Sequence, residues 1–232
     1  MMRPGLFQRN CFWSAALWAA VSLPAFSQQA ATITYTQDFP GSDPSHFAIS
    51  ISEDRPARYE GNGRLITNSR YSNDDSVPDT EQMEFTASSS LIAKIFDLTK
   101  RANHFKGQVD SNKRNLAFTG KKTLTYSDGA QKTSATYNYS TIPEIFELTR
   151  IFQNLSNTLE FGRRLDYFHR HQKLALDQES KQMESSAKGG GLEDVPAIAP
   201  IMQKIIDDRS VINVVRARLQ RLLASSAGPK PN

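Results

Sequence analysis

Hydrophobic and small polar residues alternate along the first part of the chain. In segments 32–36 and 47–52, isoleucine, tyrosine and phenylalanine stand between threonine, serine or alanine. A period of two that is carried by β-branched and aromatic residues predicts strands with one apolar and one polar face. The same pattern predicts further strands at residues 83–87, 116–127 and 133–139, with Asp128-Gly129 as the turn between the last two.

A Gly61-Asn62-Gly63 motif lies between residues 57–60 and 64–67. Because asparagine and glycine tolerate positive φ, the motif predicts a tight β-hairpin that joins two short strands. Residues 71–82 are rich in aspartate, asparagine and proline, which favours an exposed loop.

Later segments change to apolar spacings of three and four, which are typical of helices. Apolar residues with this spacing occupy 91–105 and follow Ser88-Ser89-Ser90, which offers a hydroxyl as N-cap. Thr141-Ile142-Pro143-Glu144 has the form of a capping box. It predicts a second helix that continues to about Ser185, with Gly162 as its weak point.

Gly189-Gly190-Gly191 is expected to end this helix as a flexible connector. After it, apolar positions between Ile198 and Leu222 recur with a period of 3.5, interrupted by Asp208. Two interpretations stay open for this segment. It forms one long helix, or it forms two shorter helices that are separated at residues 208–210, with Ser210 as the cap of the second.

The first two predicted helices share a short motif near their starts. Segments 94–100 and 144–150 agree at isoleucine, phenylalanine, leucine and threonine. A duplicated strand-strand-helix unit, enlarged in its first copy by residues 55–82, would explain the match. Chance similarity between two amphipathic helices is the alternative.

Together these elements predict an α+β fold, in which a small antiparallel sheet is followed by a long C-terminal helical hairpin. The sheet is built from one strand-strand-helix unit or from its duplication. The expected organisation is a signal peptide at 1–27, a strand-rich α+β domain at 28–142, a helical hairpin at 143–224 that packs on the sheet or extends from it, and a disordered tail at 225–232.

Composition narrows the class of protein further. The 232 residues have a mean hydropathy of −0.51, which excludes a polytopic membrane protein. One cysteine, Cys11, is too few for a disulfide framework or a cysteine-based metal site.

The N-terminus has the pattern of a secretory signal peptide. Arg3 and Arg9 precede an apolar run from Cys11 to Leu23, and small residues stand at the −3 and −1 positions of a cut before Gln28. An uncleaved anchor is the alternative, but this run of 13 residues is short for a bilayer that needs about 20. The expected protein is therefore exported, periplasmic or extracellular, without a transmembrane anchor after cleavage.

Cleavage before Gln28 leaves 26 basic and 24 acidic residues, because Arg3 and Arg9 are removed, so the mature charge is 26 − 24 = +2. This small excess gives no support to nucleic acid as a partner.

The sequence predicts no catalytic, cofactor-binding or metal-binding residue, and no cofactor. The histidines are His46, His104, His169 and His171. His169 and His171 are two positions apart and point to different helix faces, which argues against a shared zinc ion.

The acidic loop with Asp74, Asp75, Asp79 and Glu81 is interpreted as solvated, with a calcium site as the less favoured alternative. Asp43-Pro44-Ser45-His46 is interpreted as a turn in preference to an acid–base pair.

One basic segment contains interleaved aromatic residues. Arg163, Arg164, Arg170 and Lys173 surround Tyr167 and Phe168. They form a solvated helix face balanced by nearby acids, or they contact an anionic partner such as phospholipid head groups or an acidic protein face. A second cluster, Arg216, Arg218 and Arg221, lies near a helix C-terminus, where the helix dipole favours cations.

Five motifs follow one another along the chain: Ile49-Ser-Ile-Ser-Glu-Asp, Tyr59-Glu-Gly-Asn-Gly, Lys94-Ile-Phe-Asp-Leu-Thr-Lys, Lys122-Thr-Leu-Thr-Tyr-Ser-Asp-Gly and Leu159-Glu-Phe-Gly-Arg-Arg-Leu. In this succession, over most of residues 45–224, the chain resembles a family of exported bacterial proteins that carries no assigned function. The resemblance implies export and a strand-helix domain, and it implies no site residue.

Three functions are compared. The leading hypothesis is a non-enzymatic binding or assembly module that recognises another envelope or secreted protein through its sheet face or its helical hairpin. The second is a hydrolase whose site is assembled from dispersed residues such as His46, Asp54 and His104. The third is an inhibitor of a secreted enzyme, for which the loop at 71–82 would be the natural insert.

Overall fold

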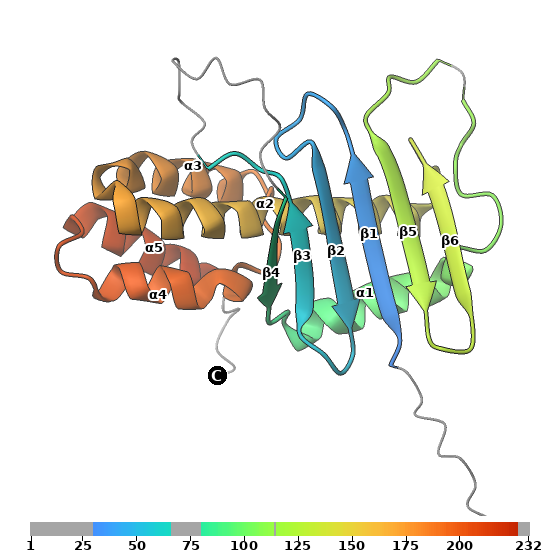
Figure 1. Ribbon diagram of the computed structural model, residues 1–232, viewed down its shortest axis with the longest axis horizontal. Helices are drawn as coiled ribbons and strands as arrows, with labels where there is room; N and C mark the ends of the chain where they lie inside the picture. The colour runs from blue at the N-terminus through green and yellow to red at the C-terminus, as the bar shows by residue number, and fades with distance from the viewer. Residues whose placement is uncertain (1–29, 66–79, 114, 227–232) are drawn as a thin grey trace, which may run out of the picture.

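The computed structural model describes residues 30–65, 80–113 and 115–226. Its strands form one six-stranded antiparallel sheet in the order β4-β3-β2-β1-β5-β6 (Figure 1). The strands are β1 (Thr32–Asp38), β2 (His46–Ser52), β3 (Ala57–Gly61), β4 (Glu81–Phe85), β5 (Lys121–Ser127) and β6 (Lys132–Tyr137).

The α-helices are α1 (Ser89–Arg101), α2 (Pro143–His171), α3 (Leu176–Lys188), α4 (Ala199–Asp207) and α5 (Asn213–Ser226). Single turns of 3₁₀ helix occur at η1 (Asn103–Phe105), η2 (Lys173–Ala175) and η3 (Val195–Ile198). A sheet followed by C-terminal helices confirms the predicted α+β class. No helix in the described part of the chain has both the length and the apolar composition needed to cross a bilayer.

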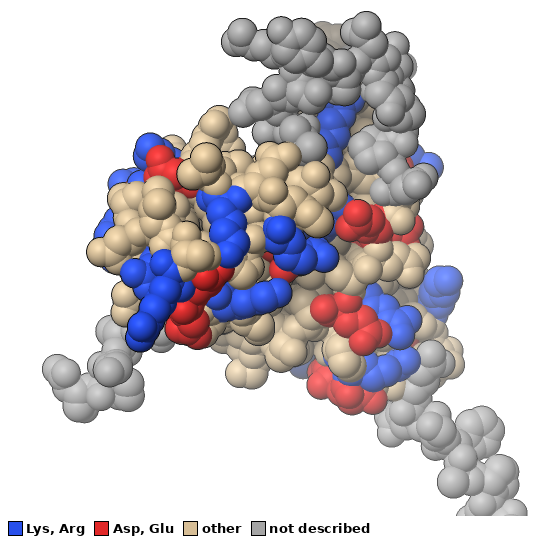
Figure 2. Space-filling view, turned by 60° about the vertical axis from the view of Figure 1, so that its left-hand side comes forward, with Lys and Arg blue, Asp and Glu red and all other residues tan. Residues whose placement is uncertain are grey.

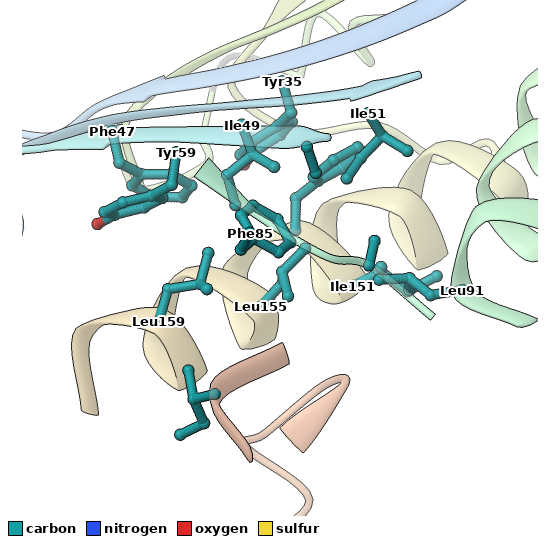
Figure 3. Packing of buried hydrophobic residues seen from close by; sticks show 14 of the residues in the cluster. Tyr35, Phe47, Ile49, Ile51, Tyr59, Phe85, Leu91, Ile151, Leu155 and Leu159 are labelled. Atoms are coloured by element: carbon teal, nitrogen blue, oxygen red, sulfur yellow. The ribbon is translucent and has the colours of Figure 1, made fainter. Parts of the chain in front are cut away.

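Alternation along the strands places one apolar face of the sheet against α1 and α2, which pass behind the strands in Figure 1. Tyr35 on β1 stacks on Phe152 of α2, with ring centroids 5.0 Å apart. Figure 3 shows the strand side chains pointing toward Leu155 and Leu159 of the same helix. The buried aromatic and β-branched side chains explain why these segments fold as strands with a fixed register.

The second half of α2 continues past β4, where it is joined by the last three helices (Figure 1). α2 contacts α3, α3 contacts α5, α5 contacts α4, and α4 contacts α2. This is a closed bundle of four helices. One continuous hydrophobic cluster extends from the sheet through α2 into the bundle. α2 therefore packs both against the sheet and within the helical bundle.

Each arm of the expected helical hairpin is divided in two. The first arm breaks at Gln172, which has φ −147° and lets α3 fold back so that Leu176 and Met183 become buried. The second arm breaks at Asp208, whose carboxylate accepts hydrogen bonds from the backbone N–H and the hydroxyl of Ser210. Of the two interpretations of this segment, the one with two shorter helices is confirmed, although α5 begins at Asn213 and not after Ser210.

The predicted hairpin at Gly61-Asn62-Gly63 is wrong. β3 pairs with β4, Gly61 lies opposite Glu81, and neither Arg64 nor Leu65 belongs to a strand. Positive φ is not the reason for the glycines, because neither residue has it. Gly63 instead permits a close approach, since a Cβ atom there would lie 2.2 Å from Oε2 of Glu160.

The helix starts agree with the sequence in part. Ser88 is the N-cap of α1, and its hydroxyl accepts from the N–H of Leu91 at 3.3 Å. The capping box at residues 141–144 does not form, because Ile142 is the N-cap of α2 without a side-chain hydrogen bond. Gly162 causes no break in α2.

The signal peptide at 1–27, residues 66–67 of the expected hairpin, most of the loop at 71–82, and residues 227–232 of the expected tail lie outside the described residues.

Candidate binding surface

The outer face of the sheet, which faces the viewer in Figure 1, is not covered by any described helix. Its side chains come from the polar positions of the alternating strands. Most carry a hydroxyl group: Thr32, Thr34 and Thr36 on β1, Ser50 and Ser52 on β2, Thr123, Thr125 and Ser127 on β5, and Ser134 and Thr136 on β6. We call this set the hydroxyl face.

The strand register aligns these residues in rows, because directly opposite residues of an antiparallel pair point to the same face. Two rows cross all six strands. One of them contains Ser134, Thr125, Thr34, Ser50, Arg58 and Glu84.

Hydrogen bonds between opposite side chains order the rows. The hydroxyls of Thr34 and Ser50 are 2.9 Å apart, and those of Thr125 and Ser134 are 3.1 Å apart. At the other end of the row, the Arg58 Nε donates to Glu84 Oε1 at 3.2 Å. The hydroxyl face is therefore an ordered polar surface that ends in an exposed ion pair.

The size of the hydroxyl face can be worked out from strand geometry. Five spacings of about 4.8 Å and strands of up to 7 residues at about 3.4 Å each give roughly 24 by 24 Å at most. Two shallow depressions of about 430 and 370 Å³ lie on either side of Arg58. Polar residues, among them Ser50, Arg58 and Glu84, line both depressions.

His46 lies at the margin of this face where β2 begins, between two carboxylates. Its Nδ1 is 2.6 Å from Oδ1 of Asp38, and its Nε2 is 3.8 Å from Oε1 of Glu60. Gln82 donates to the other oxygen of Glu60 at 3.1 Å. The sequence suggested Asp43 as an acidic neighbour, but Asp43 accepts from the backbone N–H of Arg64 instead. The strand register could have suggested Asp38, which pairs with His46 directly across β1 and β2.

The structure does not bring the proposed hydrolase residues together. His46 begins β2, whereas Asp54 follows the end of that strand and accepts from Ser52 at 2.9 Å. His104 lies in η1, where its ring packs against Tyr126 at 4.6 Å. The six residue steps of β2 from His46 to Ser52 span about 20 Å, so Asp54 beside Ser52 lies far from His46.

Among the residues that the structure describes, no three histidine, cysteine, aspartate or glutamate side chains are grouped so that they could hold a metal ion. His169 is buried and its Nε2 is 2.8 Å from Asp208, whereas His171 is exposed. The two histidines therefore point in different directions, as their spacing predicts.

The basic segment of α2 is paired with carboxylates. Arg164 Nε donates to Glu179 at 2.7 Å, Arg170 contacts Asp166, and Lys173 donates to Asp208 at 2.7 Å. Figure 2, in which the helical end of the molecule comes forward, shows acidic side chains among the basic ones. The interpretation as a balanced helix face is therefore favoured over one as a site for an anionic partner.

Arg218 of the second basic cluster is buried, and it contacts Asp177 at 3.0 Å and Ser180 at 2.7 Å. It joins α5 to α3 inside the bundle.

A buried polar network joins the sheet to α2. The hydroxyl of Tyr59 on β3 donates to Glu160 at 2.5 Å, and Arg163 Nη1 donates to both oxygens of the same carboxylate at 2.7 and 2.8 Å. Burial and the Glu160 charge raise the pKa of the Tyr59 hydroxyl far above its usual value. The network was missed because Tyr59 and Glu160 are 101 positions apart. Its members bind one another, so it stabilises the fold and offers no open site.

A comparison with protein-family models and a search of curated proteins found no match to this chain. The resemblance to exported bacterial proteins over residues 45–224 stays a prediction.

Proposed function

We propose that this protein is an exported, periplasmic or extracellular, non-enzymatic binding module that holds another envelope or secreted protein on its hydroxyl face. One observation carries the proposal: a whole sheet face is left uncovered by the described helices, and its side chains are aligned in register. An ordered surface of this kind needs little rearrangement when a partner docks, which lowers the entropic cost of binding.

The geometry of the face favours a macromolecular partner. Small-molecule sites are enclosed and mostly apolar. The depressions beside Arg58 are shallow and open to solvent, and polar residues make up most of the lining of each. The face measures about 500 Å² when its shorter edge strands are allowed for. A standard protein interface buries about 800 Å² on each partner. The sheet face together with the loops at its margin therefore matches a protein partner in scale.

The chemistry of the face also suits a protein surface. Threonine and serine hydroxyls both donate and accept, so they can bind polar groups of either kind. Arg58 has a side chain that is 75% exposed, although it is hydrogen-bonded to Glu84. Arginine is enriched among the residues that contribute most to protein interfaces. We expect Arg58 to be the strongest single contact.

Placing a charge on the face tests the proposal. Thr125→Glu puts a carboxylate into a row that crosses all six strands without touching the apolar core, because Thr125 points outward. Gln182→Glu adds the same charge on the exposed surface of α3 and serves as the matched control.

The partner would be captured from an envelope fraction by site-specific cross-linking at residue 34 and purified, and its affinity for each variant would be measured by calorimetry. We expect Gln182→Glu to bind like the wild type and Thr125→Glu to bind at least tenfold more weakly, which corresponds to about 1.4 kcal/mol. Equal affinity of the two variants would show that the hydroxyl face is not the interface.

A further inference from the structure

A second surface lies at the end of the sheet, where β5 begins and β6 ends. Three large apolar or aromatic residues are exposed there: Leu116 by 41%, Phe118 by 60% and Tyr139 by 40%. The ring of Phe39, in the loop after β1, packs edge-on against Phe118 with centroids 6.0 Å apart. We call Leu116, Phe118 and Tyr139 the loop cluster.

Asn138 brings the three residues of the loop cluster into one small area. Its Nδ2 donates to the carbonyl of Ala117 at 3.0 Å, and its Oδ1 accepts from the N–H of Thr119 at 2.8 Å. Ala117 lies between Leu116 and Phe118, and Tyr139 follows Asn138 directly. One side chain thus clamps the backbone of the loop next to the end of β6.

Lys122 binds the backbone of the same loop through hydrogen bonds. Its side chain is buried, and its Nζ donates to the carbonyl oxygens of Thr119, Gly120 and Asn138 at 3.0, 3.2 and 2.9 Å. Burial lowers the pKa of Lys122, and the nearby Asp110 carboxylate offsets part of this effect. The exposed apolar side chains are therefore displayed on a backbone that is fixed by hydrogen bonds.

The chain around the loop cluster is strongly basic. Segment 106–122 contains five basic residues, at 106, 113, 114, 121 and 122, and one acidic residue at 110, so its formal charge is 5 − 1 = +4. The whole chain also has a formal charge of +4, so all other residues sum to zero. Lys113 and Lys121 are exposed and form no ion pair with another described residue.

We propose that the loop cluster and its flanking lysines dock the protein on the surface of an anionic phospholipid bilayer. Exposed apolar side chains that are flanked by lysines are the combination that binds the membrane–water interface. The apolar groups enter the headgroup region, and the cations attract anionic lipid. The two surfaces adjoin at Lys121, which shares the outer face of β5 with Thr123. Leu116, Phe118, Tyr139 and Lys113 lie outside the strands, so docking is tested separately from the partner proposed for the hydroxyl face.

The expected size of each contribution follows from general magnitudes. Burial of a phenylalanine side chain stabilises by about 1.5–3 kcal/mol, so its loss weakens binding about tenfold to a hundredfold. One lysine near an anionic surface contributes about 1 kcal/mol, or about fivefold in affinity. Binding is expected to weaken as salt is added, because the lysines are exposed.

The experiment is co-sedimentation of the purified protein with vesicles of mixed phosphatidylglycerol and phosphatidylcholine, and with vesicles of phosphatidylcholine alone. We expect the wild type to bind the mixed vesicles at least tenfold more tightly than the neutral ones. Phe118→Ser should lose about tenfold or more in affinity for the mixed vesicles. Lys113→Glu combined with Lys121→Glu should lose about twenty-fivefold or more.

Two variants in the helical bundle are matched controls. Leu174→Ser removes an apolar side chain that is 87% exposed, and Lys188→Glu reverses a lysine whose side chain is 75% exposed. Both should bind the mixed vesicles like the wild type, and so should the hydroxyl-face variant Thr125→Glu. The thermal unfolding of every variant is recorded alongside, and an unchanged midpoint assigns a loss of binding to the surface.

Two results would overturn the docking proposal. The first is a wild type that does not sediment with the mixed vesicles, which would leave an acidic protein as the occupant of this surface. The second is a loss for Leu174→Ser as large as that for Phe118→Ser, which would show that binding is not specific to the loop cluster. Neither result bears on the hydroxyl face, whose test uses the partner protein.

Discussion

Replacing Arg163 by methionine tests how the sheet is joined to α2. The Arg163 and Glu160 side chains are 8% and 2% exposed. Arg163 also contacts Glu81 at the start of β4 at 2.9 Å. Burial alone would lower the pKa of Arg163, but the nearby Glu160 and Glu81 carboxylates raise it by more. Arg163→Met removes the cation beside the Glu160 carboxylate. Among the described residues, the Tyr59 hydroxyl is then the one hydrogen-bond donor that this carboxylate keeps.

The cost of this substitution can be estimated from the burial of the pair. Removing one partner of a buried ion pair costs about 3–5 kcal/mol, because an uncompensated charge remains inside. The total stability of such a domain is about 5–15 kcal/mol. One kcal/mol shifts the melting temperature of a domain of this size by about 2–4 °C. We therefore expect Arg163→Met to melt roughly 6–20 °C below the wild type.

The measurement is urea unfolding followed by circular dichroism, supported by thermal melting. In the double variant Arg163→Met/Glu160→Gln no charge is left buried, so it should be more stable than Arg163→Met alone. Arg101→Met is the matched control, since Arg101 and its partner Asp97 are 55% and 63% exposed. An exposed pair of this spacing contributes about 0.3–0.5 kcal/mol. A loss for Arg163→Met no larger than that for Arg101→Met would refute the argument from buried charge.

Three further outcomes are expected. A hydrogen bond from Arg150 and a smaller effect of Lys94 lower the pKa of Glu147 to about 2. The ion pair between Glu147 and Arg150 therefore stabilises the fold above about pH 4.5 and loses this effect as the pH falls toward 2. In Glu147→Gln the free energy of unfolding should depend less on pH in that range, with a difference of no more than about 1 kcal/mol. Lys122→Met leaves three carbonyls without their donor, and should cost about 1–3 kcal/mol and speed hydrogen exchange in the clamped loop. Gly162→Ala places a Cβ 2.6 Å from Cγ2 of Ile198. Overpacking should cost about 1–3 kcal/mol, which exceeds the gain of about 1 kcal/mol from the higher helix propensity of alanine. Urea unfolding should therefore show a net loss of stability.

The strands could be predicted because their signal is local. The alternation at 32–36 and 47–52 appears directly as β1 and β2, with the apolar positions buried. The predicted strand at 116–127 starts later, at Lys121, because the preceding residues are held by Asn138 in the clamped loop. That contact joins residues 21 positions apart, and the alternation pattern does not contain it.

The glycine motif at residues 61–63 shows why turn signals can mislead. Asn62 is buried, and its side-chain oxygen accepts from the backbone N–H of His46 at 2.9 Å. Gly63 lies over the Glu160 carboxylate. A glycine that is needed for close packing and a glycine that is needed for positive φ look the same in the sequence.

The candidate surfaces were predictable to different degrees. The threonines on β1 and β5 follow from two alternating segments, 32–36 and 123–127, whose polar positions must share one face once the strands pair. The loop cluster does not follow from periodicity. Leu116 and Phe118 were assigned to a strand, and their exposure depends on the clamp by Asn138, which closes only in the folded protein.

The two proposed surfaces are compatible in orientation. Side chains of the hydroxyl face stand roughly perpendicular to the sheet, whereas the loop cluster lies beyond the strand ends. A protein that docks through the loop cluster therefore has its strands directed toward the bilayer and its hydroxyl face directed sideways, along the membrane plane. In Figure 1, α2 runs across the strands, so the bundle beyond β4 extends parallel to the same plane. A partner protein can then reach the hydroxyl face without displacing the protein from the bilayer, and vesicle-bound protein should bind the partner as tightly as free protein does.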